Sequence, residues 1–310
     1  MVLHHRTGAC SRRYERLESK NAEGVNHRPT KRYGLSFAPL YNKGETGDKK
    51  ETVILWRDGM YKIAKITFKQ FKKRAEDILD TIENILSMLC KNGQILEEWI
   101  VEKHDQTYVA NVVTTDDDSL NAEYYNQYIL KEIANCDMDI QIVCDDAMAS
   151  DSCHCAEHSY YILAVDPSQS SSPIICGDCG KEISLIRIPY LYKEEEHYSI
   201  LQFQKLYQAV DRLWLESLSD RFTKRQIIDY NSQLNKRGLD IRAELERNVN
   251  KPVYYLLCNP IGGLFEFEKN NKKLEFCPKC GGELVKFNNP YPYADKVCNT
   301  CRLAFVTHEE

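Results

Sequence analysis

The alternation of hydrophobic and polar positions predicts a regular series of elements between residues 61 and 144. Apolar and polar side chains alternate at 61–69, as in a strand with one buried face. Apolar residues then recur at helical spacing from Phe71 to Leu89, and KNG at 91–93 is a helix stop. The predicted elements are a strand at 61–69, a helix at 71–89, a hairpin of strands at 95–103 and 107–115, a helix at 116–136 and a strand at 138–144. Their order, β-α-β-β-α-β, predicts a ferredoxin-like domain over residues 60–150.

The second half of the chain mixes short apolar segments with two helical regions. Strands are favoured for YYILAV at 160–165, SLIRIPYLY at 184–192 and PVYYLLC at 252–258. A helix is predicted from His197 to Ser217. A second helical region begins at Phe222, and we expect Gly238 to interrupt it.

Residues 1–59 show no sustained hydrophobic period and are basic, with 12 Lys and Arg against 7 Asp and Glu. We expect this segment to be disordered. If Arg57 is encoded by AGG, the codons for Trp56 and Arg57 read TGGAGG, which resembles a ribosome-binding site shortly before Met60. Our hypothesis is therefore that Met60 is the true start. The alternative is a flexible basic arm that contacts nucleic acid.

Composition excludes several classes of protein. With 43% hydrophobic side chains, a chain of 310 residues can bury a core and form two or three domains. No apolar run approaches the about 20 residues that a membrane span needs, and the N-terminus lacks the apolar core of a secretory signal. We therefore expect a cytoplasmic protein without a membrane partner, in which thiols stay reduced.

Thirteen cysteines in a reducing compartment indicate metal ligands and buried thiols rather than disulfides. Cys90, Cys136, Cys144 and Cys258 stand alone in apolar segments, where we expect packed and inert thiols. Cys10 lies in the unpatterned N-terminal stretch. The other eight cysteines form two clusters.

The C-terminal cluster has regular spacing. Cys277-x2-Cys280 is followed by a 17-residue spacer and then by Cys298-x2-Cys301, which is the arrangement of a zinc ribbon. Four thiolates around one ion leave no position for water or substrate, so the site is predicted to be structural. A redox dithiol is the alternative, but it would ordinarily need a single CxxC.

The first cluster is less regular. It contains four cysteines around a 20-residue gap, namely Cys153, Cys155, Cys176 and Cys179. These four thiolates suffice for a second structural zinc ion. His154 and His158 are alternatives to either N-terminal ligand, and His158 is the preferred substitute.

A catalytic interpretation of the first cluster is also open. CAE at 155–157 followed by a CxxC is similar to the zinc deaminases, where Glu157 would be the general acid and base. Three features depart from that pattern: Pro173 is two residues too early, YYILAV favours a strand where deaminases need a helix, and Cys153 can close the site. We therefore favour a non-enzymatic role.

Two charged stretches have structural and functional interpretations. Asp116, Asp117 and Asp118 could bind a metal or partner, but we favour an interaction with the dipole of a following helix. Residues 205–251 carry 10 Lys and Arg against 7 Asp and Glu, and Tyr207, Trp214 and Tyr230 are interleaved with these charges. This pattern is normal for amphipathic helices and is also compatible with a nucleic-acid surface.

Four segments of the chain resemble a family of known sequences. These are YKIAKITFK, SPIICGDCGKEISLIRIPYL, PVYYLLC and the terminal CPKCGGEL with CNTCRLAF. Together they resemble an uncharacterised bacterial family of zinc-ribbon-containing proteins for which nucleic-acid binding has been suggested. The resemblance runs from Met60 to the end of the chain.

The sequence thus predicts an α+β protein with two structural zinc ions. The expected segments are a disordered 1–59, a ferredoxin-like domain at 60–150, a zinc-knuckle and helical domain at 151–265 and a zinc ribbon at 266–310. Residues 60–152 hold 9 basic and 18 acidic side chains, whereas 153–310 hold 20 and 21, so nucleic acid or nucleoprotein would bind the C-terminal half. The alternatives are a protein-interaction adaptor that neutralises a basic partner through the acidic N-terminal domain and, third, a deaminase-like zinc hydrolase.

Overall fold

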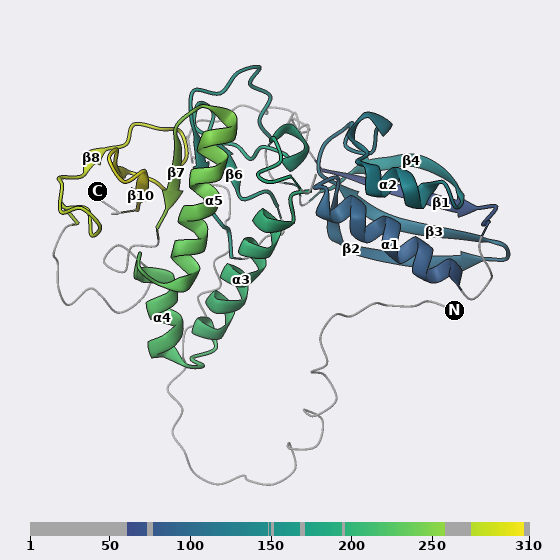
Figure 1. Cartoon of the computed structure of the whole chain (residues 1–310), viewed down its shortest axis with the longest axis horizontal. Coiled ribbons are helices and arrows are strands. Elements are labelled where there is room, and N and C mark those ends of the chain that lie inside the picture. Colours follow the sequence, from purple (N-terminus) through teal and green to yellow (C-terminus); the bar gives the residue numbers. More distant parts are fainter. Residues whose placement is uncertain are drawn as a thin grey trace, which may run out of the picture.

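The computed structural model describes most of the chain after residue 60. The described residues are 61–72, 77–147, 149, 152–167, 171–193, 196–257 and 274–306. The hypotheses about residues 1–59 and the Met60 start therefore lie outside the described residues, as do Cys10 and Cys258. The fold is mixed α+β and contains two sheets (Figure 1).

The N-terminal part forms a four-stranded antiparallel sheet with helices on one face. Its elements are β1 (Lys62–Lys69), α1 (Ile78–Lys91), β2 (Ile95–His104), β3 (Thr107–Thr114), the 3-10 helix η2 (Ala122–Tyr124), α2 (Gln127–Ile133) and β4 (Asp137–Asp145). The strands lie in the order β2-β3-β1-β4, and every neighbouring pair is antiparallel. The predicted strands at 61–69, 95–103, 107–115 and 138–144 are thus all present within one or two residues of their expected bounds.

Burial in this part follows the hydrophobic pattern. Strand β3 alternates between half-buried and buried positions, as a strand with one face on a core must. Helix α1 buries Ile82, Ile85, Leu86 and Leu89, which lie on one face at helical spacing. The helix ends before Gly93, whose φ of +76° is the left-handed conformation typical of a helix C-terminus.

Two helices are shorter than the pattern predicted. Phe71 precedes α1 and instead packs edge-on against Tyr108, with ring centres 5.7 Å apart. The expected helix at 116–136 is reduced to α2, because the Asn126 side chain caps the helix there by accepting hydrogen bonds from the backbone N–H groups of Tyr128 and Ile129. Upstream of Asn126 the chain forms turns and η2.

The rest of the described chain is built on a six-stranded sheet. Its elements are β5 (Tyr161–Leu163), β6 (Ile174–Cys176), the 3-10 helix η3 (Leu185–Arg187), α3 (Tyr198–Leu215), α4 (Asp220–Ile228), α5 (Gln233–Val249), β7 (Val253–Leu256), β8 (Val285–Lys286), β9 (Lys296–Cys298) and β10 (Leu303–Phe305). The strand order is β6-β5-β7-β10-β9-β8. Strand β7 lies parallel to both β5 and β10, so it joins the strands of the first cysteine cluster to those of the second.

The predicted strand at 184–192 is wrong. The chain there forms η3 and then an irregular segment that buries Leu185, Ile188 and Leu191. Buried positions three residues apart cannot all lie on one face of a strand, whose side chains alternate with a period of two. Pro189 also removes a backbone donor that a ladder would need.

Gly238 does not interrupt the second helical region. It lies inside α5, where a Cβ atom would approach the rings of Phe203 and Tyr255 to 2.8 Å. The glycine therefore allows α5 to pack closely against α3 and β7, and this close approach offsets its low helix propensity. The helical region is instead divided earlier, by the turn between α4 and α5.

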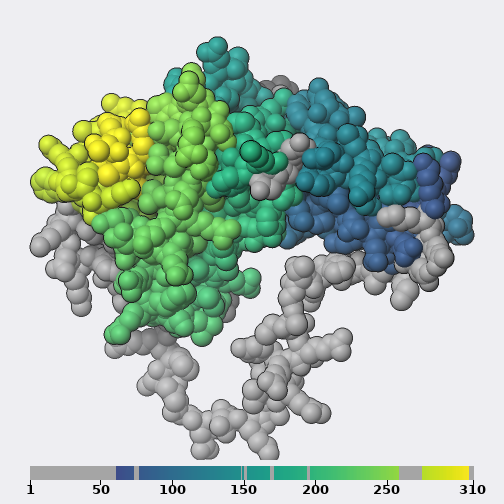
Figure 2. Space-filling view, in the orientation of Figure 1, coloured from purple at the N-terminus to yellow at the C-terminus, as the bar shows by residue number. Residues whose placement is uncertain are grey.

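The two parts of the chain that carry the two sheets meet at a polar interface, which we call the seam. Arg187 forms ion pairs with Asp116 (3.0 Å) and Asp118 (2.6 Å), so the acidic run binds a cation from η3 rather than the dipole of a following helix. Elsewhere along the seam, the Tyr61 hydroxyl donates to Glu182 (3.1 Å) and Lys205 pairs with Glu97 (2.6 Å). In Figure 2 the surfaces of the two parts are in contact across this seam.

None of the helices in the described part of the chain is long and apolar enough to cross a bilayer.

Candidate metal centres

The first cysteine cluster is built on a tight turn at the end of β6. The backbone N–H of Gly180 donates to the carbonyl of Cys176 (2.9 Å), and the N–H of Cys176 donates to the carbonyl of Lys181 (2.8 Å). Gly180 has φ +73°, a conformation that residues with a Cβ rarely adopt. The turn places the Cys176 and Cys179 side chains on the same side of the chain.

The second cluster contains the same turn. Gly281 N–H donates to the Cys277 carbonyl (2.8 Å), Cys277 N–H donates to the Gly282 carbonyl (2.7 Å), and Gly281 has φ +71°. Both turns have the sequence Cys-x-x-Cys-Gly. The shared local sequence therefore produces one shared backbone geometry, although the two clusters have different spacing overall.

The remaining two cysteines of each cluster are also held by backbone hydrogen bonds. Cys153 N–H donates to the Glu182 carbonyl (2.8 Å), and Cys155 N–H donates to the Cys153 sulfur (3.4 Å). In the second cluster, Cys298 ends β9 and its sulfur accepts from the N–H of Cys301 (3.4 Å). Donors aimed at sulfur favour the thiolate form, which is the form that binds metals.

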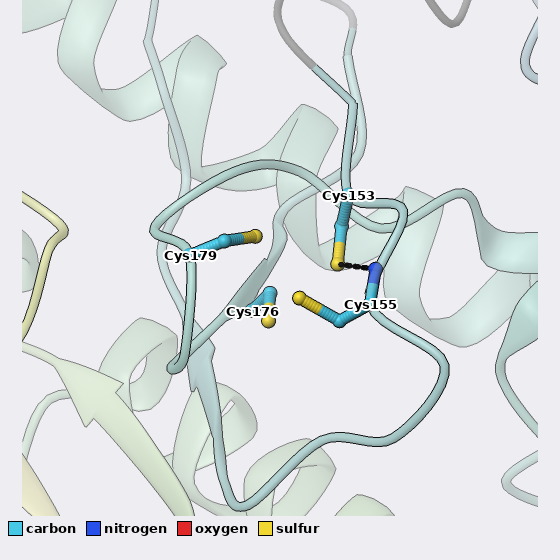
Figure 3. A group of neighbouring side chains, drawn as sticks. All are labelled: Cys153, Cys155, Cys176 and Cys179. Carbon is cyan, nitrogen blue, oxygen red and sulfur yellow. Dashed lines mark hydrogen bonds between the residues drawn. The ribbon is translucent and has the colours of Figure 1, made fainter.

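Each cluster brings four sulfur atoms into one small volume. The ligand atoms of Cys153, Cys155, Cys176 and Cys179 all lie within 4.8 Å of one another, and Figure 3 shows these side chains gathered around a common space. Four thiolates at about 2.3 Å from one ion would lie roughly 3.8 Å apart, so only a small contraction separates this arrangement from a tetrahedral site.

The sulfur atoms of the C-terminal cluster are grouped as closely as those of the first cluster. The ligand atoms of Cys277, Cys280, Cys298 and Cys301 also lie within 4.8 Å of one another. The sulfur atoms of Cys280 and Cys298 are 3.6 Å apart. Both clusters could therefore hold a metal ion.

Neither histidine of the first cluster belongs to its four-sulfur group. His158 Nε2 lies 3.4 Å from the sulfur of Cys153, where it can donate a hydrogen bond to a thiolate. His154 Nε2 lies 3.0 Å from the Ser152 hydroxyl. His158 is thus a neighbour of the ligand group, and His154 points to a different partner.

The thiols differ in their electrostatic environment. Burial raises the pKa of Cys153 and of Cys301 well above the usual range. The pKa of Cys280 is lowered to about 7, because the backbone N–H of Gly282 and neighbouring thiols donate to its sulfur. Several adjacent thiolates, some of them buried, repel one another without a cation, so these donor sets suit a bound divalent ion.

The surroundings of Glu157 differ from those of a deaminase. Glu157 is exposed, and the chain that follows it enters strand β5 rather than a helix. Cys153 stands close enough to complete a four-sulfur set with Cys155 and the β6 turn. The geometry therefore provides a set of four thiols, and the carboxylate that contacts one of them is that of Asp178, 4.0 Å from the Cys176 sulfur, rather than that of Glu157.

The isolated cysteines have two different environments. Cys90 and Cys136 are buried, as expected for packed thiols, and burial raises the pKa of Cys90 to about 11. Cys144 is exposed on β4, so the expectation of a packed thiol is wrong there. It lies near the end of β4, a strand at the edge of the described sheet that pairs there with β1.

Arg302 supports the second cluster and was missed by the sequence analysis. It follows Cys301 with φ +55°, and its carbonyl accepts from the N–H of Tyr255 in β7 (2.9 Å). Its guanidinium lies 5.4 Å from the ring centre of Tyr254. No sequence signal marks an arginine in this left-handed conformation, since glycine is the residue expected there.

Comparisons with known proteins find that the chain is similar to uncharacterised bacterial proteins. Residues 155–258 match a domain of unknown function (DUF2310), and residues 60–139 match another domain of unknown function (DUF8589). One uncharacterised protein of Haemophilus influenzae is 26% identical over 226 residues, which cover 68% of this chain and 84% of the relative. A second uncharacterised protein of the same organism is 28% identical over 166 residues, which cover 53% of this chain and 78% of the relative. No solved structure matches the chain significantly.

Proposed function

We propose that each cysteine cluster binds one Zn²⁺ ion with a structural role. The observation that supports this most directly is the grouping of four sulfur atoms in each cluster. Zinc prefers four thiolates in tetrahedral geometry, and such a closed site leaves no position for substrate. The strands beside the second cluster have only two or three residues, so their hydrogen-bonded ladders are short and a bound ion would add stability to them.

Metal analysis of the purified full chain tests this proposal. We expect two zinc ions per chain, and we expect a strong chelator to remove both with loss of folded structure. A content of one ion per chain would remove one cluster from the proposal. Two ions that leave the circular dichroism unchanged when removed would contradict the structural role.

The variant Glu157→Gln separates a structural first site from a catalytic one. Because Glu157 is exposed, we expect the free energy of unfolding to change by less than about 0.5 kcal/mol and the zinc content to stay at two ions. Denaturant unfolding and metal analysis would measure both quantities. A deaminase-like site would instead show turnover of a nucleoside or base that this substitution abolishes while zinc stays bound.

For the architecture, we propose a ferredoxin-like domain at 60–150 followed by a zinc-knuckle and helical segment at 151–265 and a zinc ribbon at 266–310. The strand order β2-β3-β1-β4 with two helices on one face supports the first assignment. The last two segments contribute strands to a single sheet, so we treat them as one structural unit.

We further propose that this zinc protein binds nucleic acid or nucleoprotein in the cytoplasm through its C-terminal half. Exposed cationic side chains on the helices of that half support this: Arg212, Arg221, Lys236 and Arg237. Other cations of the region are engaged in ion pairs, such as Arg242 with Glu246 and Arg247 with Glu244. Fewer cationic side chains are therefore available to phosphates than the number of basic residues in 205–251 implied.

Retention on immobilised nucleic acid at increasing salt tests this function. We expect elution to shift to lower salt in the double variant Arg221→Ala with Arg237→Ala, because each lost phosphate contact reduces the release of counterions. Arg247→Ala is the matched control, since Arg247 is already paired with Glu244. No retention at low salt, or the same elution for all three proteins, would contradict the proposal.

The alternative function is that of an adaptor that neutralises a basic protein. The N-terminal part supports it through two exposed carboxylates on the edge strand β4, Asp137 and Asp139, whereas Asp145 on the same strand is paired with Lys62 (2.5 Å). Capture of partners from the native host, with and without nuclease, distinguishes the two functions. A basic protein that remains bound after nuclease treatment would favour the adaptor.

A further inference from the structure

A groove of about 790 Å³ lies beside α4 in the C-terminal half of the chain. Its lining comes from the first turns of α4, from Ser219 before them and from residues 231–233, which lead into α5. We call this the α4 groove. Its volume falls within the range of about 300–1,000 Å³ for ligand sites. In Figure 1 the connection from α3 to α4 lies at the lower tip of the helices, away from both sheets.

The two walls of the α4 groove are tied together by hydrogen bonds. The Gln226 side chain accepts from the backbone N–H of Leu234 (3.1 Å), and the Ser232 hydroxyl donates to the Gln226 carbonyl (2.7 Å). The buried Asn235 side chain of α5 donates to the carbonyl of Ile227 in α4 (2.9 Å). The groove is therefore preformed, and a ligand would not have to order its walls on binding.

Phe222 is an exposed aromatic residue in the wall of the groove. It lines the α4 groove and is 55% exposed, although phenylalanine is among the residues most often buried. Thr223 and Ile227 are the buried residues of α4, so the helix already has a face against the core and Phe222 lies outside it. The ring therefore offers an accessible apolar surface to a ligand in the groove.

The groove carries more positive than negative charge. Its lining includes Arg221 and Arg225 against the single carboxylate of Asp220. Arg221 is exposed and forms no ion pair within the described part of the chain, and the Arg225 side chain remains 74% exposed although it pairs with Asp229. The exposed basic pair at 236–237 lies one turn farther along α5, on the side of the groove wall, because residues three and four apart are neighbours on a helix. This charge complements a phosphate-bearing ligand.

We propose that the α4 groove binds single-stranded nucleic acid, with a phosphate at Arg221 and an unpaired base against the Phe222 ring. Cations beside an exposed aromatic side chain are the usual means of holding a single strand, because its backbone is charged and its bases are accessible. The exposed amides of Asn231 and Gln233 add uncharged donors and acceptors to the groove. The inference rests on the proposed nucleic-acid function and specifies the form of the nucleic acid and the place where it binds.

Binding of defined oligonucleotides to the zinc-loaded full chain tests the inference. The probes are labelled oligothymidylate and oligouridylate of about twelve nucleotides, and a DNA duplex of the same length, with affinity measured by fluorescence anisotropy. We expect at least one single strand to bind about tenfold more tightly than the duplex. The reason is that the bases of a duplex are stacked on one another and cannot contact Phe222.

Two variants and their matched controls assign the binding to this groove. Phe222→Ser removes the ring, and we expect the affinity for the single strand to fall about tenfold. Leu215→Ser is its control, because Leu215 is 54% exposed but does not line the groove. Arg221→Gln should reduce the slope of log affinity against log salt by about 0.7, the value for one phosphate contact on a single strand. Arg247→Gln should leave this slope unchanged, since Arg247 pairs with Glu244.

All four altered side chains are exposed, so circular dichroism and zinc content should match those of the unaltered protein. The inference is overturned if the duplex binds as tightly as the single strands, if Phe222→Ser lowers affinity no more than Leu215→Ser, or if Arg221→Gln leaves the salt slope unchanged. Any of these results together with salt-sensitive retention on nucleic acid would leave the proposed function standing without this site.

Failure of every oligonucleotide to bind would contradict the proposed function and the inference together. Vesicles of phosphatidylglycerol are tested in parallel, because cations beside exposed apolar side chains also suit an anionic lipid surface. Vesicle binding without oligonucleotide binding would assign the α4 groove to lipid and overturn the inference.

Discussion

Replacing Cys298 with serine should reduce the zinc content from two ions to one and unfold the strands around the C-terminal cluster. Cys298 ends β9, is 4% exposed and belongs to the large core that also contains Cys277 and Cys301. Structural zinc in small modules supplies about 10–16 kcal/mol of apparent binding free energy. Loss of one ligand would remove most of this term, because the remaining buried thiolates would repel one another.

Metal analysis and amide hydrogen exchange would measure this effect. We expect the amide protons of β9 and β10 to lose their protection while those of the N-terminal sheet keep it. The control is Cys90→Ser, which also replaces a buried cysteine but lies in the other core. It should retain both ions and lose roughly 1–3 kcal/mol from packing and from burial of the hydroxyl. Equal loss of zinc in the two variants would refute the division into ligands and inert thiols.

Gly180→Ala should destabilise the protein by about 3 kcal/mol and weaken zinc binding. Gly180 has φ +73°, and a Cβ atom there would lie 2.8 Å from the backbone of Pro290. The left-handed conformation costs alanine about 1–2 kcal/mol, and overpacking against backbone typically costs a further 1–3 kcal/mol. Pro290 lies in the loop between β8 and β9, so the strain would reach the second cluster as well.

Gly281→Ala is a matched control that isolates the overpacking cost expected for Gly180→Ala. Gly281 occupies the same position in the other Cys-x-x-Cys-Gly turn with φ +71°, but a Cβ atom there would meet no atom within 4 Å. We expect it to cost only the conformational term of about 1–2 kcal/mol. Denaturant unfolding of the zinc-loaded proteins would measure both values. A cost for Gly180→Ala no larger than that for Gly281→Ala would show that the contact with Pro290 has no energetic weight.

The contact at Gly180 also shows how the two clusters are related. The first turn touches the loop of the second module, and strand β7 joins their strands into one sheet. Cys176, Cys277 and Cys298 lie in one hydrophobic core. The clusters are therefore parts of one packed unit, although their cysteines are about a hundred residues apart in the sequence.

Local signals in the sequence were enough to predict most of the elements. The strands of the N-terminal sheet and helices α1 and α3 follow from hydrophobic period alone, because each buries one face against a single core. The eight clustered cysteines were likewise identified by spacing, and the structure brings them together in two sets. Short motifs such as Cys-x-x-Cys-Gly specify their own turns through local hydrogen bonds and one left-handed glycine.

Other features depend on contacts between distant residues, which leave no periodic signal. Gly238 marks a close approach of α5 to Phe203 and Tyr255 rather than a helix break, and 184–192 is irregular because it packs between the two sheets. Asp116 and Asp118 meet Arg187 across the seam. The sequence by itself determined the strands of the N-terminal sheet, helices α1 and α3 and the two Cys-x-x-Cys-Gly turns, because those depend on a simple hydrophobic period or on neighbours within a few residues. Only the tertiary structure decided that both cysteine clusters share one sheet and that Arg187 meets the acidic run, because these depend on long-range packing.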